Sequence, residues 1–422
     1  MATMQFWGGV GVIGSSKVVV REGGHRVLLD LGTDIPRDGD LFRAPAGTRP
    51  GRGLADRLAV GAAPAIPGVF DPAALDPGDR LGEPGEPTKV FITHPHIDHV
   101  GLAGYIRPEV PVHASPDAAR LLRALAGAGE GLAGGDPDWI ELPEGEQVQV
   151  GPMRVERIAV DHDVPGASGY LVHTGDGTLA FTGDYRFHGH HPELSWGFAE
   201  RVAGCEVLVT EGTTLSFDEF HPLRTEADTE RSFAQALDGN PDLLIMAVYP
   251  RDVERVERFT GLAAAAGRTI VWPDRTAAFL AAMGLDAPLS HSALGLDGLR
   301  AAPGEYVFQL DADRLTDLLD LPLGPRTQFL HANGEPLGPF EPRWPLFIEW
   351  LAKLGIEHKR IGNVGHAYQD DTHRFLHRIA PKVVVPIHTL SPYRLHPVTA
   401  TTRLVVEYAR SYDFSGRTAD EG

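Results

Sequence analysis

The stretch KVFITHPHIDHVG, residues 89–101, places four potential metal ligands directly after an apolar run typical of a strand. The ligands are His94, His96, Asp98 and His99. Alternate side chains at a strand end point the same way, and a following helix start adds others to the same pocket. Imidazoles and carboxylates are preferred ligands of Zn²⁺ and its first-row neighbours. The spacing predicts one metal on His94 and His96 and another on Asp98 and His99; the alternative is a surface turn rich in histidine.

Further ligands are expected elsewhere, because one turn rarely completes a site for two metals. Three candidates each follow a predicted strand: His162 in VDHDVPG, Asp184 in AFTGD and His388 in VVVPIHT. The Asp184 carboxylate can bridge two ions. The alternative for His388 taken alone is a core histidine with satisfied hydrogen bonds.

The composition excludes some classes of function. The chain has 422 residues and a net charge of −19, so it is long enough for two or three domains and has no evident basic face. A nucleic-acid substrate therefore needs a local basic cleft or a metal site. Cys205 is the only cysteine, which excludes an intramolecular disulfide and thiolate metal sites. No signal peptide or membrane span is recognised, so no membrane partner and a cytoplasmic location are expected.

The order of strand and helix patterns predicts two kinds of sheet. Residues 17–32 read as a hairpin, and residues 36–88 as a Pro/Gly-rich surface excursion with short helical pieces. Strands follow at short intervals from 147 to 184. After residue 212 strands and helices alternate, which predicts a parallel, doubly wound sheet. The tail from about Arg410 is polar and expected to fray.

Taken together, the motifs resemble those of the β-CASP group of metallo-β-lactamase-fold hydrolases, in its ribonuclease J-like branch. The resemblance rests on THPHIDHVG, the DH of residues 161–162, FTGD, PIHT, the opening GGVGVIGSS with LLDLG, Glu211 in VTEGTT and His366 in NVGHAY. It implies an α/β fold, a metallo-β-lactamase αββα sandwich with an inserted α/β β-CASP domain. The implied division is 1–211 for the first part of the sandwich, 212–365 for the insert, 366–410 for the return segment and 411–422 for a polar tail.

The resemblance also implies a binuclear metal site. Its ligands are His94, His96 and His162 on one ion, Asp98, His99 and His388 on the other, and Asp184 between them. Two divalent ions are expected, Zn²⁺ first and Mn²⁺ as the alternative, with a metal-activated water attacking a phosphodiester. The implied catalytic residues are Asp98, Asp184 and His366, of which His366 protonates the leaving oxygen or holds a phosphate. Glu211 is expected behind the ligands, orienting a histidine such as His388.

Single-stranded RNA, bound between the two domains, is the implied substrate. The expected substrate contacts are Val364, Gly365, Tyr368 and Arg251. Other candidates for a phosphate groove or for base stacking are Arg186, Arg255, Arg343, Tyr185, Tyr249 and Trp344. The alternatives are solvated arginines and aromatic rings packed in the core.

Three features depart from the family pattern. The usual Ser-Gly-His-Ala-Ser is Val-Gly-His-Ala-Tyr at residues 364–368, which removes two hydroxyls that could donate to phosphate. The cluster HGHH, residues 188–191, is expected to be a solvated loop, with an accessory metal or substrate contact as the alternative. Because the chain ends soon after the last motif, no counterpart of the C-terminal dimerisation domain of ribonuclease J is expected; a homo-oligomer is the alternative to a monomer.

Three interpretations of the function follow. The first is an RNA-processing nuclease. The second is a metallo-hydrolase acting on a small ester or phosphodiester, which the acidity and the altered motif suit. The third is a non-catalytic binding subunit, against which the complete ligand set argues. The motifs leave open RNA or DNA as substrate, exo or endo cleavage and its polarity, and Zn²⁺ or Mn²⁺ as the working metal.

Overall fold

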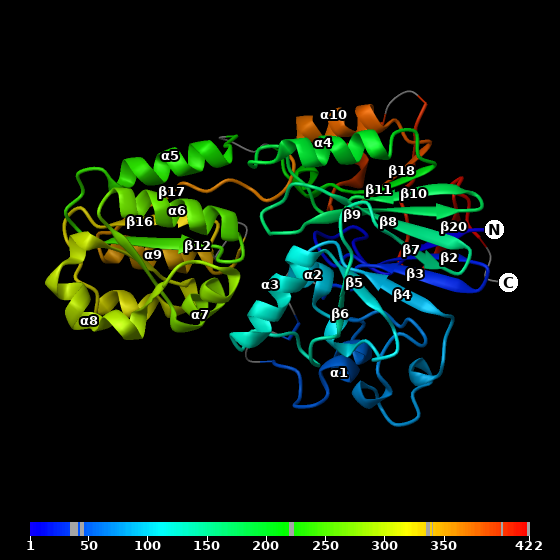
Figure 1. Cartoon of the computed structure of the whole chain (residues 1–422), viewed down its shortest axis with the longest axis horizontal. Helices are drawn as coiled ribbons and strands as arrows, with labels where there is room; N and C mark the ends of the chain where they lie inside the picture. The colour runs from blue at the N-terminus through cyan, green and yellow to red at the C-terminus, as the bar shows by residue number, and fades with distance from the viewer. Residues whose placement is uncertain are drawn as a thin grey trace.

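The computed structural model describes residues 1–33, 41–42, 46–218, 223–334, 338–339, 341–397 and 400–419. Within these ranges the strands form three sheets. Two sheets stack face to face, and the third lies in a separate lobe, at the left of Figure 1. Both chain ends lie on the stacked sheets, at the side away from that lobe (Figure 1).

The two stacked sheets share one apolar core. The first has the order β20 (Ser411–Asp413), β1 (Thr3–Phe6), β2 (Val18–Glu22), β3 (His25–Leu29), β4 (Thr88–Phe91), β5 (Val112–Ala114), β6 (Trp139–Glu141). The second has the order β19 (Thr402–Arg403), β18 (Val383–Ile387), β11 (Val207–Glu211), β10 (Gly177–Phe181), β9 (Ser168–Thr174), β8 (Met153–Ala159), β7 (Gln147–Val150). Phe6 and Phe91 from the first sheet pack with Tyr170, Phe181 and Ile387 from the second.

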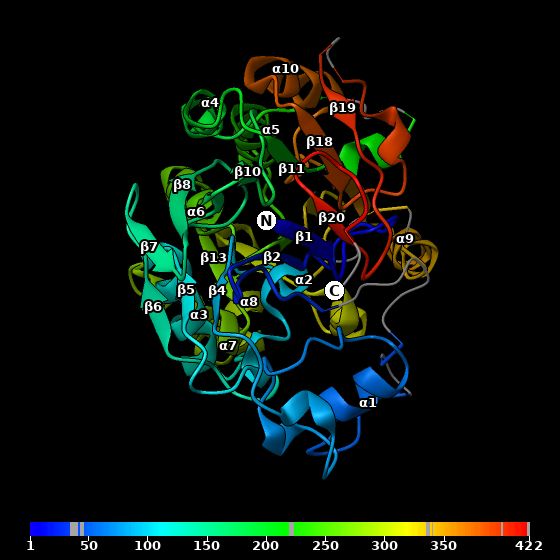
Figure 2. The same cartoon turned by 90° about the vertical axis from the view of Figure 1, so that its right-hand side faces the viewer.

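Helices cover the two outer faces of this pair. The first sheet carries α1 (Gly53–Ala59), α2 (Ile97–Val100) and α3 (Pro116–Gly127), and the second carries α4 (Pro192–Arg201) and α10 (Gln369–Ile379). Figure 2 shows α4 and α10 at one edge and α1 at the opposite edge. As the sequence predicts, α3 begins at Ser115, whose hydroxyl accepts a bond from the Ala118 amide (3.1 Å), with Pro116 in the first turn. These layers confirm the expected αββα sandwich.

The third sheet is parallel throughout, as the strand and helix alternation predicts. Its order is β14 (Leu289–Ser290), β13 (Thr269–Trp272), β15 (Tyr306–Gln309), β12 (Leu244–Val248), β16 (Gln328–Ala332), β17 (Glu357–Arg360). Helices α5 (Glu226–Leu237), α6 (Val253–Ala265) and α7 (Asp274–Met283) pack on one face, and α8 (His291–Ala301) and α9 (Trp344–Lys353) on the other.

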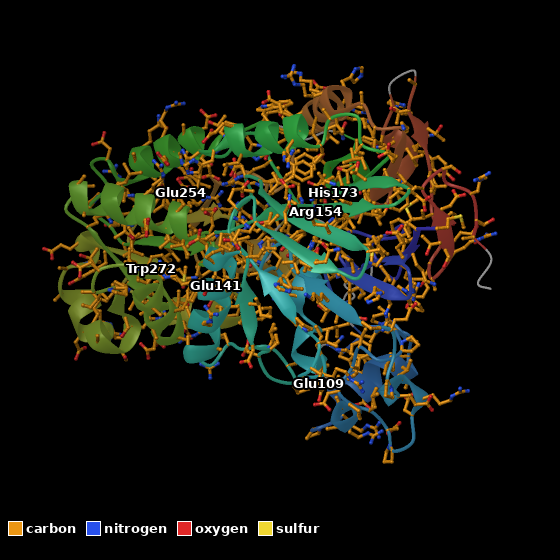
Figure 3. All side chains as sticks on the ribbon, turned by 45° about the vertical axis from the view of Figure 1, so that its right-hand side comes forward. Glu109, Glu141, Arg154, His173, Glu254 and Trp272 are labelled. Carbon is orange, nitrogen blue, oxygen red and sulfur yellow. The ribbon has the colours of Figure 1, made fainter. Side chains whose placement is uncertain are left out.

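This lobe, called the insert below, also contacts the sandwich. Leu121 and Leu125 of α3 belong to the same apolar cluster as Phe279 of α7. Figure 3 labels Trp272 and Glu254 in the insert, and Arg154 and His173 on strands of the sandwich. The strands of the insert lie within residues 244–360. The domain boundaries at 212 and 365 stay predictions.

The expectation of a frayed tail is wrong. Ser411 pairs with Gln5 across β20 and β1, and Tyr412 and Phe414 are buried in the sandwich core. The apolar rings account for the difference, because their burial stabilises an edge strand that the polar residues around them do not suggest. Residues 420–422 lie outside the described ranges.

The excursion at 36–88 is more than a surface loop where it is described. It carries α1 and two short 3₁₀ turns, as expected, but Leu54, Ile66 and Phe70 are buried beneath the first sheet. Residues 36–40 and 43–45 of this segment lie outside the described ranges. Among the described helices, none is both long and apolar enough to cross a bilayer.

Candidate metal centre

The predicted ligands meet at one end of the sandwich because their strands point in the same direction. Strands β8, β10, β11 and β18 run in one direction through the second sheet. His162, Asp184 and His388 follow the carboxyl ends of β8, β10 and β18. The motif after β4, in the facing sheet, brings His94 and His96 to the same end. Sequence segments nearly 300 residues apart thus supply one cluster of ligand atoms.

One group of ligand atoms has the spacing that a tetrahedral ion requires. His96 Nδ1 lies 3.1 Å from His94 Nε2 and 3.2 Å from His162 Nε2. Bonds of about 2.0–2.1 Å to a tetrahedral ion place ligand nitrogens about 3.3 Å apart. Asp184 Oδ2 lies 3.7 Å from His94 Nε2 and completes the group of four. The residues present therefore fit a divalent metal.

A second group adjoins the first through the same carboxylate. His388 Nε2 lies 3.1 Å from Asp98 Oδ2 and 3.5 Å from Asp184 Oδ2. His99 Nε2 lies 3.3 Å from Asp184 Oδ2 and 3.7 Å from Asp98 Oδ2. Among the described residues, His99 Nε2 and Asp184 Oδ1 are buried without a hydrogen-bond partner. Buried polar atoms without a partner are costly, and a cation between these groups would satisfy them.

The other ring nitrogen is also held in four of the five proposed ligand histidines. The exception is His96, whose Nε2 lies 3.4 Å from Asp163 Oδ1 with no hydrogen bond between them. His99 Nδ1 donates to Asp30 (2.7 Å), and His162 Nδ1 donates to the Gly365 carbonyl (2.7 Å). His388 Nδ1 contacts Thr213 Oγ1 (2.7 Å), and His94 Nδ1 contacts Thr93 Oγ1 (2.9 Å). Such partners fix the ring orientation and the tautomer of a metal ligand. His388 also has a φ of 54°, a backbone conformation rare for a residue other than glycine. The structure thus orients each ring toward the cluster.

The electrostatics of the first group favour neutral imidazoles with free lone pairs. Burial lowers the pKa of His94 and His96, and it lowers the pKa of His162 to about 3. In the second group, burial opposes protonation of His99, but the surrounding Asp184, Asp98 and Asp30 raise its pKa well above the ordinary value. These carboxylates therefore require positive charge among them, which a divalent ion also supplies.

His366 faces the cluster from the segment that leads from the insert back to the sandwich. Its Nδ1 lies 3.6 Å from Asp184 Oδ2 and 3.3 Å from Glu211 Oε1. Burial opposes protonation, but Glu211 and then Asp184 raise the pKa of His366 to about 9. A protonated imidazole at this place can give a proton to a leaving oxygen.

The expectation that Glu211 orients His388 is wrong. Glu211 Oε1 contacts His366, and its other oxygen accepts a bond from the Thr213 amide (2.8 Å). The Thr213 hydroxyl holds His388 instead. Glu211 ends β11 and Thr213 lies two residues further on, so each can contact a different histidine, and the sequence does not reveal which residue contacts which.

Three of the predicted substrate contacts, Val364, Gly365 and Tyr368, are bonded to other parts of the protein. The carbonyls of Val364 and Gly365 accept bonds from His188 and His162. The ring of Tyr368 is buried against His188, and its hydroxyl bonds to the backbone of Arg224. Tyr368 is therefore not exposed for base stacking.

Arg251 is partly exposed. Its Nη2 lies 3.9 Å from Glu130 Oε2 across the seam between the insert and the sandwich. It lines a cavity of about 230 Å³ beside Pro95 and Ile97 of the metal motif. This position suits contact with a substrate.

Most of the other candidate arginines and aromatic residues are buried or paired, and one lies beside the site. Arg186 and Arg255 are buried in ion pairs, so the expectation that they line an open groove is wrong. Tyr185 belongs to the sandwich core, and Trp344 packs against His331 in the insert. Arg343 pairs with Glu341, whereas the ring of Tyr249 lies 5.4 Å from that of His96. Of the aromatic candidates, Tyr249 lies beside the site.

The HGHH cluster is not the solvated loop that was expected. His188 is buried, and its Nε2 donates to the Val364 carbonyl (2.7 Å). His190 pairs with Glu230 (2.8 Å), and His191 lies 3.4 Å from Glu254. The cluster therefore joins the sandwich to α5, α6 and the return segment.

Sequence reasoning missed the residues behind the ligands. Asp30, Thr93 and Thr213 are not among the predicted residues. Asp163 is not predicted either, and its Oδ1 lies 3.3 Å from the cluster-facing His162 Nε2. Asp30 carries a usable signal, because it ends an apolar strand in LLDLG beside the strand that leads to the metal motif. The two threonines carry no such signal, since threonine at a strand end is common.

Comparisons with known proteins agree with this geometry. Residues 10–246 match the metallo-beta-lactamase superfamily. The chain is 23% identical over 351 residues to a ribonuclease J of Pyrococcus abyssi, covering 74% of this chain and 76% of that protein. It is 26% identical over 206 residues to a ribonuclease J of Mycolicibacterium smegmatis, covering 47% of this chain and 35% of that protein. A crystal structure described as a protein of unknown function from Enterococcus faecalis has a TM-score of 0.81 and 27% identity, and covers 97% of this chain and 99% of its own.

Proposed function

Because this chain belongs to the metallo-beta-lactamase superfamily, as a ribonuclease J-like member of its β-CASP group, we propose that it is a metal-dependent ribonuclease. The superfamily and the ribonuclease J relatives bear out the expectation of a metal-dependent hydrolase. The observation that carries the proposal is the convergence of imidazoles from both stacked sheets on one shared carboxylate, Asp184.

The proposed site holds two divalent ions. One ion would be held by His94, His96, His162 and Asp184. The other would be held by Asp98, His99 and His388, with Asp184 added because it lies 3.3 Å from His99 and 3.5 Å from His388. Zn²⁺ suits the imidazole-rich first group best, and Mn²⁺ is the alternative because the second group is richer in carboxylate. Ions bound there would supply an activated water and positive charge opposite the oxygens of the phosphate under attack.

The chain's own residues supply the proton transfer and the positioning. His366 donates a proton to the leaving oxygen, and Glu211 keeps its imidazole protonated. The expected catalytic part of Asp98 is to hold the second ion; its carboxylate lies 3.1 Å from His388 Nε2, another ligand in the same proposed set. Asp30 and Thr213 keep the rings of His99 and His388 turned inward.

The proposed substrate is single-stranded RNA at the seam between sandwich and insert. The relatives named ribonuclease J support this choice. Arg251 and Tyr249 lie at the seam, where a phosphate and a base of a single strand need a cation and an aromatic face. Cleavage from an end or within the strand, a cytoplasmic location and self-association stay predictions.

A second candidate is hydrolysis of a small phosphodiester. It is favoured by the Val-Gly-His-Ala-Tyr segment, which lacks two hydroxyls for phosphate, and by the net charge of −19. A substrate panel separates the two functions. Metal-loaded protein is incubated with end-labelled single-stranded RNA, the matching DNA and a chromogenic phosphodiester. RNA cleavage supports the ribonuclease, whereas turnover of the small diester with intact RNA overturns it.

A further inference from the structure

A buried polar cluster ties together the segments that join the insert to the sandwich. We call it the junction network; it consists of Arg186, Glu226, Arg255 and Asn363. Glu226, at the start of α5, accepts from Arg186 Nη1 (2.8 Å), Arg255 Nε (3.0 Å) and Asn363 Nδ2 (3.0 Å). Arg255 of α6 also donates through Nη2 to Asn363 Oδ1 (2.6 Å). One carboxylate thus connects the sandwich, two helices of the insert and the segment that leaves the insert.

Joining two lobes through buried charged groups costs free energy, because the charges lose their contact with water. Arg186, Glu226 and Arg255 are each 2% exposed or less, and Asn363 is 4% exposed. Burial opposes ionisation of Glu226, but Arg255 and Arg186 lower its pKa to about 2, so the group stays charged. Buried ion pairs contribute little net stability compared with apolar packing, although a lost partner leaves a costly unpaired charge. A network of this kind instead controls the relative position of the segments that it joins.

The geometry that it controls is that of the metal centre. Asn363 directly precedes Val364 and Gly365, whose carbonyls accept bonds from His188 and His162. His366 follows and faces Asp184. On the sandwich side, the Arg186 amide donates to the carbonyl of Asp161 (2.7 Å), the residue before the ligand His162. The network therefore fixes the start of the short segment that carries His366, and it lies beside the strand end that carries His162.

We propose that Glu226 is a positioning residue of the hydrolytic reaction, which holds His366 over the metals through Asn363. The inference rests on the proposed function, since it needs His366 to act in hydrolysis. A displacement of about 1 Å at a reacting group can lower a rate by about 100-fold, so a buried residue far from the substrate can matter strongly.

A double-mutant cycle tests whether Glu226 acts through His366. Glu226→Gln, His366→Ala and the double variant are compared for kcat on single-stranded RNA, with metal content measured for each. We expect Glu226→Gln to lower kcat at least about tenfold with its metal content unchanged. In the His366→Ala background the same change should have little further effect. Equal losses in both backgrounds, or no loss in either, overturn the proposal.

Glu230→Gln is the matched control, because Glu230 lies one turn further along α5 and is paired with His190, where both side chains are partly exposed. It should leave kcat unchanged. If Glu226→Gln fails to fold, Asn363→Ala replaces it in the cycle, since this change leaves no charge without a partner.

Hydrogen exchange measures how firmly the segment that carries His366 is held, and it needs no substrate. Amides of residues 363–368 should exchange faster in Glu226→Gln than in the wild type, while those of β10 and β11 stay unchanged. Unchanged exchange at 363–368 contradicts the positioning role. If the wild-type protein cuts no RNA, the proposed function fails, and this measurement still shows whether the network holds the segment.

Discussion

Glu211 Oε1, at the end of β11, lies 3.3 Å from Nδ1 of His366 on the segment that returns from the insert to the sandwich. This contact joins a sandwich strand to the histidine that faces the proposed metal ligands from the returning segment. A carboxylate in this place could orient the proposed ligand His388 or hold the proton of His366. The ring of His388 is contacted by Thr213 and not by Glu211. Glu211 therefore acts on the proton of His366.

Glu211→Gln should move the pH dependence of the rate. With Glu211 present, the pKa of His366 is raised to about 9, so its imidazolium persists below that pH and is lost as the pH rises through it. Without the negative charge the imidazolium is lost at a lower pH. We expect the alkaline fall of kcat to shift to lower pH in the variant. An unchanged pH profile would mean that His366 is not the proton donor.

His366→Ala should keep the metals and lose the chemistry. His366 lies within ligand distance of Asp184 and His388, but it stands outside both proposed ligand sets, so metal content by mass spectrometry should match that of the wild type. The rate should fall by about 10² to 10⁴, as is usual when a general acid is removed. A variant with full phosphodiesterase rate would exclude the leaving-group role.

Asp184→Asn should lose metal and turnover together. Asp184 Oδ2 lies within 3.7 Å of ring nitrogens from both ligand groups, and the amide removes the charge shared between the ions. We expect metal affinity by calorimetry to fall at least about 100-fold, with no measurable hydrolysis. Glu130→Gln, beside Arg251 in the cavity, is the control and should keep both ions. Wild-type metal affinity in Asp184→Asn would disprove the bridging position.

His188→Gln should reduce the loss of unfolding free energy that occurs as the pH falls. Burial lowers the pKa of His188 to about 4, whereas the unfolded chain has the ordinary value of 6.5. Between these values the unfolded state binds the proton, so the contribution present above pH 6.5 is lost as the pH falls toward 4. The loss amounts to at most about 3 kcal/mol. Urea unfolding of metal-loaded protein at pH 7 and pH 5 measures it; equal pH slopes in both proteins would contradict the role of His188.

The sequence predicts that the proposed ligands lie close together, and the structure brings them together, because their signal is local. His94, His96, Asp98 and His99 follow one strand, and a strand end followed by a turn has little freedom in where it points such closely spaced side chains. Strand and helix alternation likewise predicts the parallel sheet of the insert, because short buried strands and amphipathic helices differ in period.

The sequence does not predict contacts that depend on tertiary packing. Arg186 and Arg255 resemble surface arginines until Glu226, from a third segment, is placed between them. Likewise, Tyr412 reads as part of a polar tail, although pairing of β20 with β1 buries it. Each of these depends on a partner more than 25 residues away along the chain, which local patterns do not report.

Metal removal and restoration tests the central claim most directly. The protein is stripped with a chelator, titrated with Zn²⁺ or Mn²⁺, and assayed on end-labelled single-stranded RNA while bound metal is counted. We predict no cleavage without metal, cleavage that is restored as two ions bind per chain, and no restoration in Asp184→Asn. Cleavage by the stripped protein at the restored rate, or intact RNA in the presence of fully loaded protein, would contradict the account.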